Sequence, residues 1–236
     1  DPDCAGAKPH LYAICCHGYS GQPQDMAKYA HRFARLGFTV LVPALRGHGL
    51  SEGRYAGMGW LDRRDLMRWI SLIIDSDADA RILLQGKSMG AAAVMMTVGE
   101  PDLPRNVVAA VEDCGYASVG QQFIDCARSM FHLPKFLAKP IVTTMGAIAR
   151  RRAGYGFQEA SCVEQLKHAT IPMLFIHGGA DDFVPSRALD ENFDACASID
   201  RQKLLIPSAG HSMSASTAPV VYWKTVTNFV TRVFGL

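Results

Sequence analysis

The amino-acid sequence predicts an α/β fold in which a mostly parallel sheet is covered by helices on both faces. Short apolar runs with the composition of strands alternate along the chain with segments of helical periodicity, and this alternation is typical of parallel sheets. The strand-like runs are apolar at consecutive positions, as expected for strands buried on both faces. With 236 residues, 49% of them hydrophobic, the chain is long enough to bury one substantial core. We therefore expect a single domain built around one sheet.

In the first half of the chain, strands and helices are expected to alternate. Apolar runs predict strands over residues 11–16, 38–43 and 81–85. Helical periodicity predicts helices over residues 25–36, 62–74 and 89–98. Gly37 follows the first of these helices directly, and glycine commonly ends a helix because it adopts a left-handed conformation without strain.

The second half of the chain contains one long segment without strands. Strands are expected over residues 106–112, 173–176 and 203–206, and the last helix over residues 219–234. Between residues 116 and 170 the apolar residues follow helical spacing, and Pro134 and Pro140 are expected to divide the helices. A plain crossover between parallel strands rarely needs more than about 30 residues. We therefore predict a helical cap over residues 116–170, inserted into a core of residues 1–115 and 171–236. Ordinary crossover helices packed on the sheet are the alternative.

Composition and charge exclude several classes of partner. The formal net charge is only +2 and 19% of the residues are charged, so no nucleic-acid partner is expected. No apolar run reaches 18 residues, so no transmembrane helix and no stable membrane insertion are expected, and no signal peptide is recognisable. We expect a cytoplasmic protein. Because the sequence begins with Asp1 rather than Met, a missing signal or membrane anchor is kept as an alternative.

The cysteines and one basic run are the other notable features of the composition. The seven cysteines form no C-x-x-C pair, and in a chain of this size they are expected to be buried free thiols. No group of residues has the spacing of a metal site, so neither a metal nor another cofactor is expected. The run Arg150-Arg151-Arg152 is interpreted as a solvated helix face. The alternative is a rim that attracts acidic substrates or lipid headgroups.

Two segments match the pattern G-x-S-x-G, in which a serine lies in a strained turn between a strand and a helix. Residues 86–90 read GKSMG, directly after a predicted strand and directly before an alanine-rich helix. Residues 49–53 read GLSEG, but no strand leads directly into them and a glycine-rich stretch follows. We therefore predict that Ser88 is a nucleophile and that Ser51 is a turn or capping residue.

A serine hydroxyl becomes a nucleophile when a histidine takes its proton and a carboxylate orients that histidine. His211 is the candidate base, because it follows the last predicted strand and precedes the last helix. Asp181 and Asp182 both follow the strand over residues 173–176 and are candidates for the acid. Asp113 is a third candidate, since its strand end can reach the same histidine. The residues alone leave these three alternatives open.

The same chemistry needs N–H donors for the negatively charged oxygen of the transition state. Met89 supplies one backbone N–H, because it follows the predicted nucleophile. We assign the second to the backbone N–H of Tyr19, in the loop after the first strand, where Gly18 allows the backbone to come close. His17 is expected to fix this loop rather than to ionise in catalysis.

The predicted cap starts from the sheet edge at which Ser88 is expected, so it can fold over the site. Its apolar side chains are more numerous than a solvent-facing crossover needs. We expect Phe123, Met130 and Phe131, which are nearest in sequence to the strand end, to line an acyl pocket. The alternative is that they pack on the sheet and only hold the cap in place.

The resemblance to a known superfamily is carried by five segments in its order and spacing: CCHGYSG, VPALRGHGLSEG, GKSMG, IHGGADDFVP and AGHS. On these segments the chain resembles the α/β-hydrolases, in the group of small capped esterases and lipases described as serine-aminopeptidase-like or monoacylglycerol-lipase-like. The resemblance implies the α/β-hydrolase fold, and it assigns the acid to Asp181, the first Asp of H-G-x-x-D-x-x-V-P. The chain departs from the family pattern at Ala44 and Lys87, and family members have strands ahead of residues 11–16.

From the residues and the resemblance together, we expect a serine hydrolase that cleaves small-molecule carboxylic esters with small to medium acyl chains. Ser88, His211 and Asp181 would form its catalytic triad. A peptidase or thioesterase with the same triad is the first alternative. A non-catalytic binding protein of the same fold is the second, and the complete set of serine, histidine and aspartate argues against it.

Overall fold

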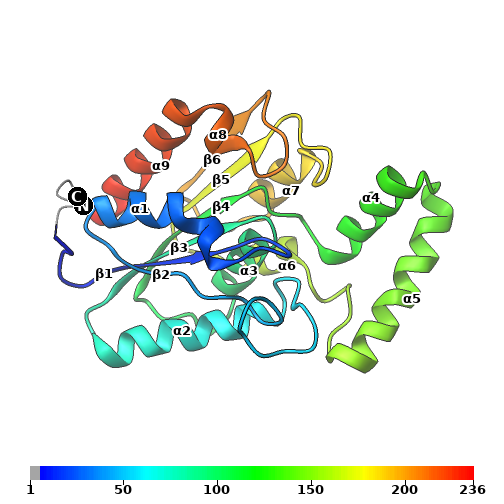
Figure 1. Ribbon diagram of the computed structural model, residues 1–236, viewed down its shortest axis with the longest axis horizontal. Coiled ribbons are helices and arrows are strands. Elements are labelled where there is room, and N and C mark those ends of the chain that lie inside the picture. Colours follow the sequence, from blue (N-terminus) through cyan, green and yellow to red (C-terminus); the bar gives the residue numbers. More distant parts are fainter. Residues whose placement is uncertain (1–5) are drawn as a thin grey trace.

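The structure, a computed structural model, describes residues 6–236 and contains a sheet of six strands. The strands lie in the order β2-β1-β3-β4-β5-β6, and each pair of neighbours is parallel (Figure 1). Their bounds are β1 (Leu11–Cys16), β2 (Thr39–Leu41), β3 (Arg81–Lys87), β4 (Val107–Asp113), β5 (Met173–Gly178) and β6 (Arg201–Ile206). The predicted α/β fold is confirmed, and the sheet is parallel throughout the described residues.

Helices cover both faces of this sheet. On one face, α1 (Ala27–Arg35) and α9 (Pro219–Phe234) pack against Ala13 and Cys15 of β1. On the other face, α2 (Asp62–Ser76), α3 (Met89–Val98), α6 (Cys162–Leu166) and α7 (Arg187–Ala195) belong to the cluster that contains Ile14 and Cys16. Figure 1 shows α1 and α9 above the sheet and α2 below it. Successive residues of β1 thus enter opposite cores, which explains why its sequence is apolar without alternation.

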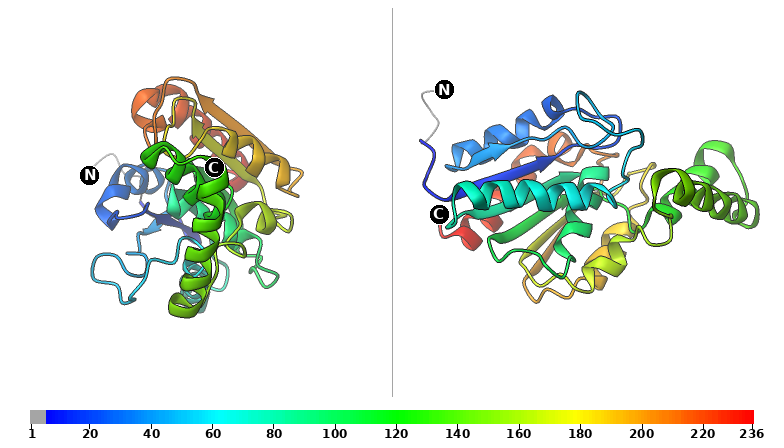
Figure 2. Two further views of the ribbon diagram at one scale, coloured as in Figure 1. Left: turned by 90° about the vertical axis from the view of Figure 1, so that its right-hand side faces the viewer. Right: turned by 90° about the horizontal axis from the view of Figure 1, so that it is seen from below.

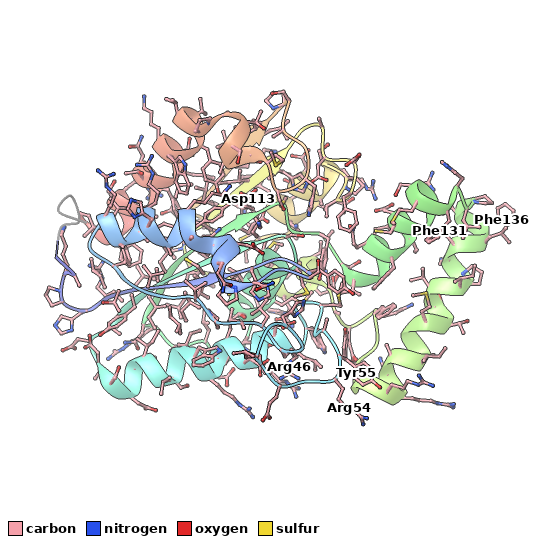
Figure 3. All side chains as sticks on the ribbon, in the orientation of Figure 1. Arg46, Arg54, Tyr55, Asp113, Phe131 and Phe136 are labelled. Atoms are coloured by element: carbon pink, nitrogen blue, oxygen red, sulfur yellow. The ribbon has the colours of Figure 1, made fainter. Side chains whose placement is uncertain are left out.

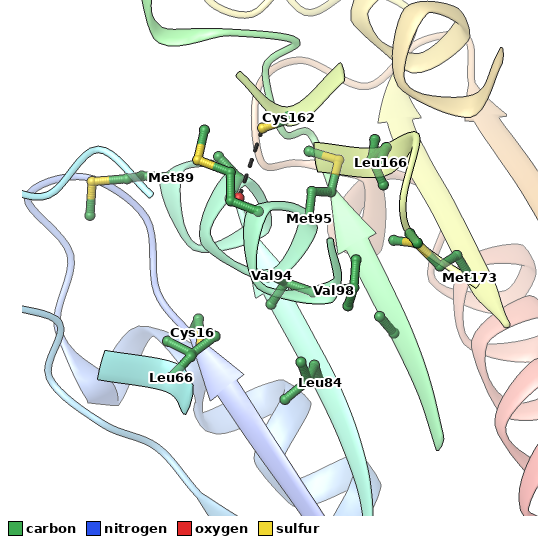
Figure 4. Packing of buried hydrophobic residues seen from close by; sticks show 14 of the residues in the cluster. Cys16, Leu66, Leu84, Met89, Val94, Met95, Val98, Cys162, Leu166 and Met173 are labelled. Carbon is green, nitrogen blue, oxygen red and sulfur yellow. Dashed lines mark hydrogen bonds between the residues drawn. The ribbon is translucent and has the colours of Figure 1, made fainter. Parts of the chain in front are cut away.

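Helix α3 lies at the centre of the larger core, and each of its ten residues is buried. Figure 4 shows Met95 and Val98 of this helix among side chains of β3, α6 and β5. The Cys162 thiol of α6 donates a hydrogen bond to the backbone carbonyl of Ala92, with a sulfur–oxygen distance of 3.8 Å. Because neighbours surround α3 on every side, the turn at its N-terminus is held in a fixed position.

The described cysteines are free thiols, as predicted. Five of them are buried, and Cys126 is partly exposed. Cys4 lies outside the described residues. Among residues 6–236, no helix is both long enough and apolar enough to span a bilayer.

One sequence-based prediction about helices is wrong, and one further helix was missed. Helix α7 was not predicted, because its polar residues leave only Ala188 and Leu189 as buried apolar positions. Helix α5 (Lys135–Ala153) was expected to be interrupted at Pro140, but the helix continues through it. Pro140 is the sixth residue of α5, and because it has no N–H the carbonyl of Phe136 lacks its hydrogen bond within the helix. Strand β2 is also shorter than the apolar run that predicted it.

The segment between β4 and β5 forms helices, as the sequence predicted. Helices α4 (Val119–Phe131) and α5 pack against each other and project beyond the carboxyl ends of the strands (Figures 1 and 2). The chain leaves and re-enters the body at neighbouring points, because Ser118 and Ser161 form an isolated antiparallel bridge. The division of the chain into a core and a cap, with boundaries at residues 115 and 171, stays a prediction.

Candidate active site

Ser88 lies in the turn between β3 and α3, as the G-x-S-x-G pattern predicts. Its backbone has φ 56° and ψ −119°, a region that costs a non-glycine residue free energy. A Cβ atom on Gly86 would lie 2.2 Å from the carbonyl oxygen of Gly90, and one on Gly90 would lie 2.2 Å from that of Cys16. Both flanking glycines are therefore required for the backbone to pass so closely. The turn projects the Ser88 side chain from the carboxyl end of β3.

Three side chains from different loops form a hydrogen-bonded chain that ends at Ser88. His211 comes from the loop between β6 and α8 (Ser214–Thr217), and Asp181 from the loop after β5. The distance from Ser88 Oγ to His211 Nε2 is 2.9 Å, and that from His211 Nδ1 to Asp181 Oδ2 is 2.8 Å. When Nδ1–H donates to the carboxylate, Nε2 is the acceptor for the serine hydroxyl. This tautomer is the one that a general base needs.

The carboxylate of Asp181 is fixed by further contacts. Its Oδ1 accepts hydrogen bonds from the backbone N–H groups of Phe183 and Val184, at 3.0 and 2.8 Å. The Nε2 atom of His177 lies 3.3 Å from its Oδ2. Burial alone would raise the pKa of Asp181, but the hydrogen bonds from His177 and His211 lower that pKa below its usual value. The side chain is therefore a carboxylate at neutral pH.

His177 was not identified as a site residue from the sequence. It is the fifth residue of β5, it is fully buried, and its Nε2 also lies 3.0 Å from the carbonyl oxygen of Val184. Burial would lower the pKa of His177, and the contact with Asp181 reverses this effect and raises it. The signal in the sequence is the histidine at the start of H-G-x-x-D, which lies four residues before the acid.

The other candidates for the acid lie elsewhere. The carboxylate of Asp113 is buried toward α1 and α9, where its Oδ2 accepts hydrogen bonds from Tyr222 at 2.9 Å and from Tyr29 at 3.4 Å (Figure 3). Asp182 is exposed to solvent. Of the three aspartates, the structure brings only Asp181 into hydrogen-bond contact with His211.

The second serine motif forms a turn. Ser51 donates a hydrogen bond from Oγ to the carbonyl of Ala44 at 2.6 Å, and its backbone N–H bonds to the carbonyl of His48. Gly49 and Gly53 on either side of it have positive φ angles, as glycines in turns often do. Ser51 therefore closes a loop, with no histidine in hydrogen-bond contact with its hydroxyl among the described residues.

The residues that carry the two predicted oxyanion donors, Tyr19 and Met89, line the same cavity as Ser88. The loop after β1 passes so closely that a Cβ atom on Gly18 would be 3.3 Å from Ser88 Cβ. The backbone N–H groups of Tyr19 and Met89 donate no hydrogen bond to any other described group. His17 holds this loop, with Nδ1 2.8 Å from the carbonyl of Gly18 and Nε2 accepting from the N–H of Leu45 at 3.0 Å. Burial lowers the pKa of His17.

Ser88 opens into a cavity of about 470 Å³ beneath α4 and α5. The residues that line it are mostly apolar and aromatic: Tyr19, Tyr55, Ala56, Met58, Met89, Tyr116, Gln122, Phe123, Cys126, Met145, Ile148, Ala149, Arg152, Ala153, Tyr155, Phe157 and Phe183. Arg152 is the one charged residue in this set.

The predicted pocket residues divide between the cavity and the surface. Phe123 lines the cavity and stacks on Phe157, with ring centroids 4.8 Å apart. Met130 and Phe131 do not line it, and they are 62% and 69% exposed near the C-terminal end of α4. Figure 3 shows Phe131 at this end of the helix. The prediction is therefore wrong for these two residues. Met145 of α5 contributes to the lining instead, because α5 folds back over the site.

One group of potential metal ligands occurs among the described residues. Donor atoms of Cys114, Asp181 and His211 lie within 4.8 Å of one another. Two of these three residues are already joined by a hydrogen bond in the chain that ends at Ser88. The thiol of Cys114 lies 3.4 Å from the hydroxyl of Ser212, and burial raises its pKa well above the usual value. This thiol is therefore protonated at neutral pH.

The fold, together with a serine in a glycine-flanked turn between β3 and α3, defines the protein as an α/β-hydrolase. The model of the family described as serine aminopeptidase, S33, matches residues 7–149. The chain belongs to this family, which confirms the resemblance found in the sequence.

Individual relatives are more distant. The chain is 26% identical over 218 residues to YqkD of Bacillus subtilis, an uncharacterized protein, and the match covers 92% of this chain and 70% of YqkD. It is 28% identical over 201 residues to the uncharacterized Rv2307c of Mycobacterium tuberculosis, which covers 84% of this chain and 62% of that protein. The structure is similar to that of the Pyrococcus furiosus esterase Pf2001, with a TM-score of 0.75 and 19% identity over 95% of this chain and 83% of the esterase.

Proposed function

We propose that the protein is a serine hydrolase that cleaves carboxylic esters with small to medium acyl chains through an acyl-enzyme intermediate. One observation carries this proposal. Two hydrogen bonds, of 2.9 and 2.8 Å, join Ser88, His211 and Asp181 in a row, and Ser88 opens into an apolar cavity. A buried polar chain that ends at a cavity is the arrangement that activates a serine.

Each of the three hydrogen-bonded residues has a role in the proposed reaction. Ser88 Oγ attacks the ester carbonyl carbon while His211 Nε2 takes its proton, and the N–H groups of Tyr19 and Met89 stabilise the oxyanion. His211 then gives the proton to the departing alkoxide, the C–O bond breaks, and the alcohol leaves. In the second half, His211 removes a proton from water, and the water oxygen attacks the acyl carbon. The bond from that carbon to Ser88 Oγ then breaks, His211 returns the proton to Oγ, and the acid leaves. Asp181 stays ionised and orients His211 throughout.

The apolar lining of the cavity favours an acyl chain, rather than a polar group, as the part of the substrate that binds there. Its volume of about 470 Å³ lies within the usual range of small-molecule sites. Each methylene group of an acyl chain that is buried there contributes about 0.8 kcal/mol to binding. The preference for acyl length should therefore follow the dimensions of this cavity.

The family description suggests an aminopeptidase as the second candidate function. An aminopeptidase must bind the ammonium group of a peptide N-terminus, and a carboxylate is the usual partner for such a cation. The cavity lining contains no carboxylate, and its single charged residue, Arg152, repels an ammonium group. Ester cleavage is therefore favoured over aminopeptidase activity. Thioesters would use the same residues and are included in the test.

The proposal is tested with p-nitrophenyl esters from acetate to palmitate, an acyl thioester and aminoacyl anilides, all assayed in parallel. We expect hydrolysis of the short and medium esters and no hydrolysis of the anilides. The Ser88→Ala variant should lower kcat by a factor of about 10⁴ or more, whereas Ser51→Ala, the matched control, should stay within a few-fold of wild type. Faster hydrolysis of anilides than of esters would identify a peptidase instead.

A further inference from the structure

Helices α4 and α5 carry apolar side chains that face solvent. The side chains are 40–75% exposed and form what we call the cap stripe: Met130, Phe131, Phe136, Leu137, Ile141, Met145 and Ile148. Four of them recur along α5 at intervals of four, four and three residues, so they share one side of this helix. A different side of α5 packs inward through Ala138, Val142 and Gly146. Apolar residues so grouped on a surface mark an interaction site.

The two helices that bear the cap stripe are also strongly basic. Residues 119–153 contain six Lys and Arg and one acidic residue, a formal charge of +5, while the whole chain has a charge of only +2. The rest of the chain is therefore net negative, at −3. The acidic residue, Asp125, is paired with Arg187 of α7. No ion pair among the described residues involves Lys135, Lys139 or Arg151.

The cap stripe is continuous with the cavity at Ser88. Met145 and Ile148 belong to both, since each is 40% or more exposed and each lines the cavity. Arg152, one turn after Ile148, lines the same cavity. At the other end of the stripe, Phe131 and Phe136 lie at the outer end of the two helices, away from the sheet (Figure 3). The stripe therefore leads from the tip of the helix pair to the mouth of the cavity.

We propose that the cap stripe docks the protein on the surface of an anionic lipid bilayer, with the mouth of the cavity turned toward the lipid. Apolar side chains flanked by Lys and Arg are the features by which helices bind in the headgroup region. Each cation near an anionic surface adds to the attraction. A second copy of the chain is a poor occupant, because two helix pairs that each carry +5 would repel one another. The docking does not depend on the proposed ester cleavage.

The test is sedimentation of the Ser88→Ala protein with vesicles, which separates binding from hydrolysis. Vesicles of phosphatidylglycerol and phosphatidylcholine should bind the protein at low salt, and vesicles of phosphatidylcholine alone should bind it at least tenfold more weakly. Phe131→Ser with Phe136→Ser should weaken binding by a factor of about ten or more. Leu72→Ser with Ile199→Ser is the matched control, because these exposed side chains lie on α2 and before β6, outside the stripe.

Several outcomes would overturn the proposal. Equal binding to the two kinds of vesicle, or no binding to the anionic ones, excludes an anionic bilayer as the occupant. A dimer in sedimentation velocity that is lost with Phe131→Ser and Phe136→Ser assigns the stripe to a second copy of the chain. The same two substitutions are also made in the enzyme that retains Ser88. Its hydrolysis of p-nitrophenyl butyrate should equal that of the wild type, since neither residue lines the cavity. A failure of docking is thus distinguished from a failure of catalysis.

Discussion

Replacing Asp181 by Asn changes one atom of the site, and the structure indicates how that atom acts on His211. Oδ1 of Asp181 accepts two backbone N–H groups, from Phe183 and Val184. An asparagine must keep its carbonyl oxygen at this position, because turning the amide would place its NH₂ group against two donors. The NH₂ group then faces Nδ1 of His211, which must become an acceptor. The proton of the imidazole moves to Nε2, which faces Ser88, and the base can no longer accept the serine proton.

The expected effect of Asp181→Asn is a fall in kcat of about 10⁴-fold, which corresponds to about 5.5 kcal/mol of transition-state stabilisation. The alternative amide orientation leaves the two backbone N–H groups unpaired, at about 1–3 kcal/mol each, so it offers little recovery. The assay is steady-state hydrolysis of p-nitrophenyl butyrate, with the melting temperature as a check on folding. Asp182→Asn is the matched control and should be near wild type, because Asp182 is exposed. A folded Asp181→Asn variant within tenfold of wild type would refute this reasoning.

Two further predictions concern the cavity and a buried acid. Phe123→Ala enlarges the cavity, so it should raise several-fold the ratio of kcat/KM for the decanoate ester to kcat/KM for the butyrate ester. Phe131→Ala, on the same helix, should leave this ratio unchanged. Equal responses of the two variants would contradict the assignment of the cavity lining. Burial raises the pKa of Glu112 from 4.5 to about 8, so the folded state binds this proton more tightly than the unfolded state does, and the stability due to Glu112 falls as pH rises from 4.5 to 8. Thermal melts should therefore show Glu112→Gln to be more stable than wild type at pH 9 but not at pH 5, and a pH-independent difference would exclude this cause.

The strands and the central helix could be predicted because their sequence patterns are determined by burial on both faces. The run Leu11–Cys16 and the final helix Pro219–Phe234 have the predicted bounds. The position of Ser88 also follows from local sequence, since Gly86 and Gly90 leave no room for a Cβ atom. These features depend on residues that lie close together in the sequence, so the sequence alone is enough to predict them.

The lining of the cavity could not be predicted in the same way, because it depends on how α4 and α5 turn relative to the sheet. Phe123 and Phe131 are both aromatic and lie on one helix, yet one lines the cavity and the other faces solvent. Eight positions separate them along the helix, about two turns, and the sequence alone does not specify how far the helix extends beyond the sheet. His177 was missed although the H-G-x-x-D motif contains it, because its contact with Asp181 forms only when the loop that carries Asp181 is in place.

The claim that Ser88 is the activated nucleophile is tested most directly by finding which residue reacts with a fluorophosphonate. This reagent forms a covalent bond with an activated serine. The protein is incubated with the reagent, digested and analysed by mass spectrometry. We expect one adduct per chain, on the peptide that contains Ser88; the adduct should be absent from Ser88→Ala and retained in Ser51→Ala. An adduct on the peptide of Ser51, or no adduct on the folded wild-type protein, would contradict this claim.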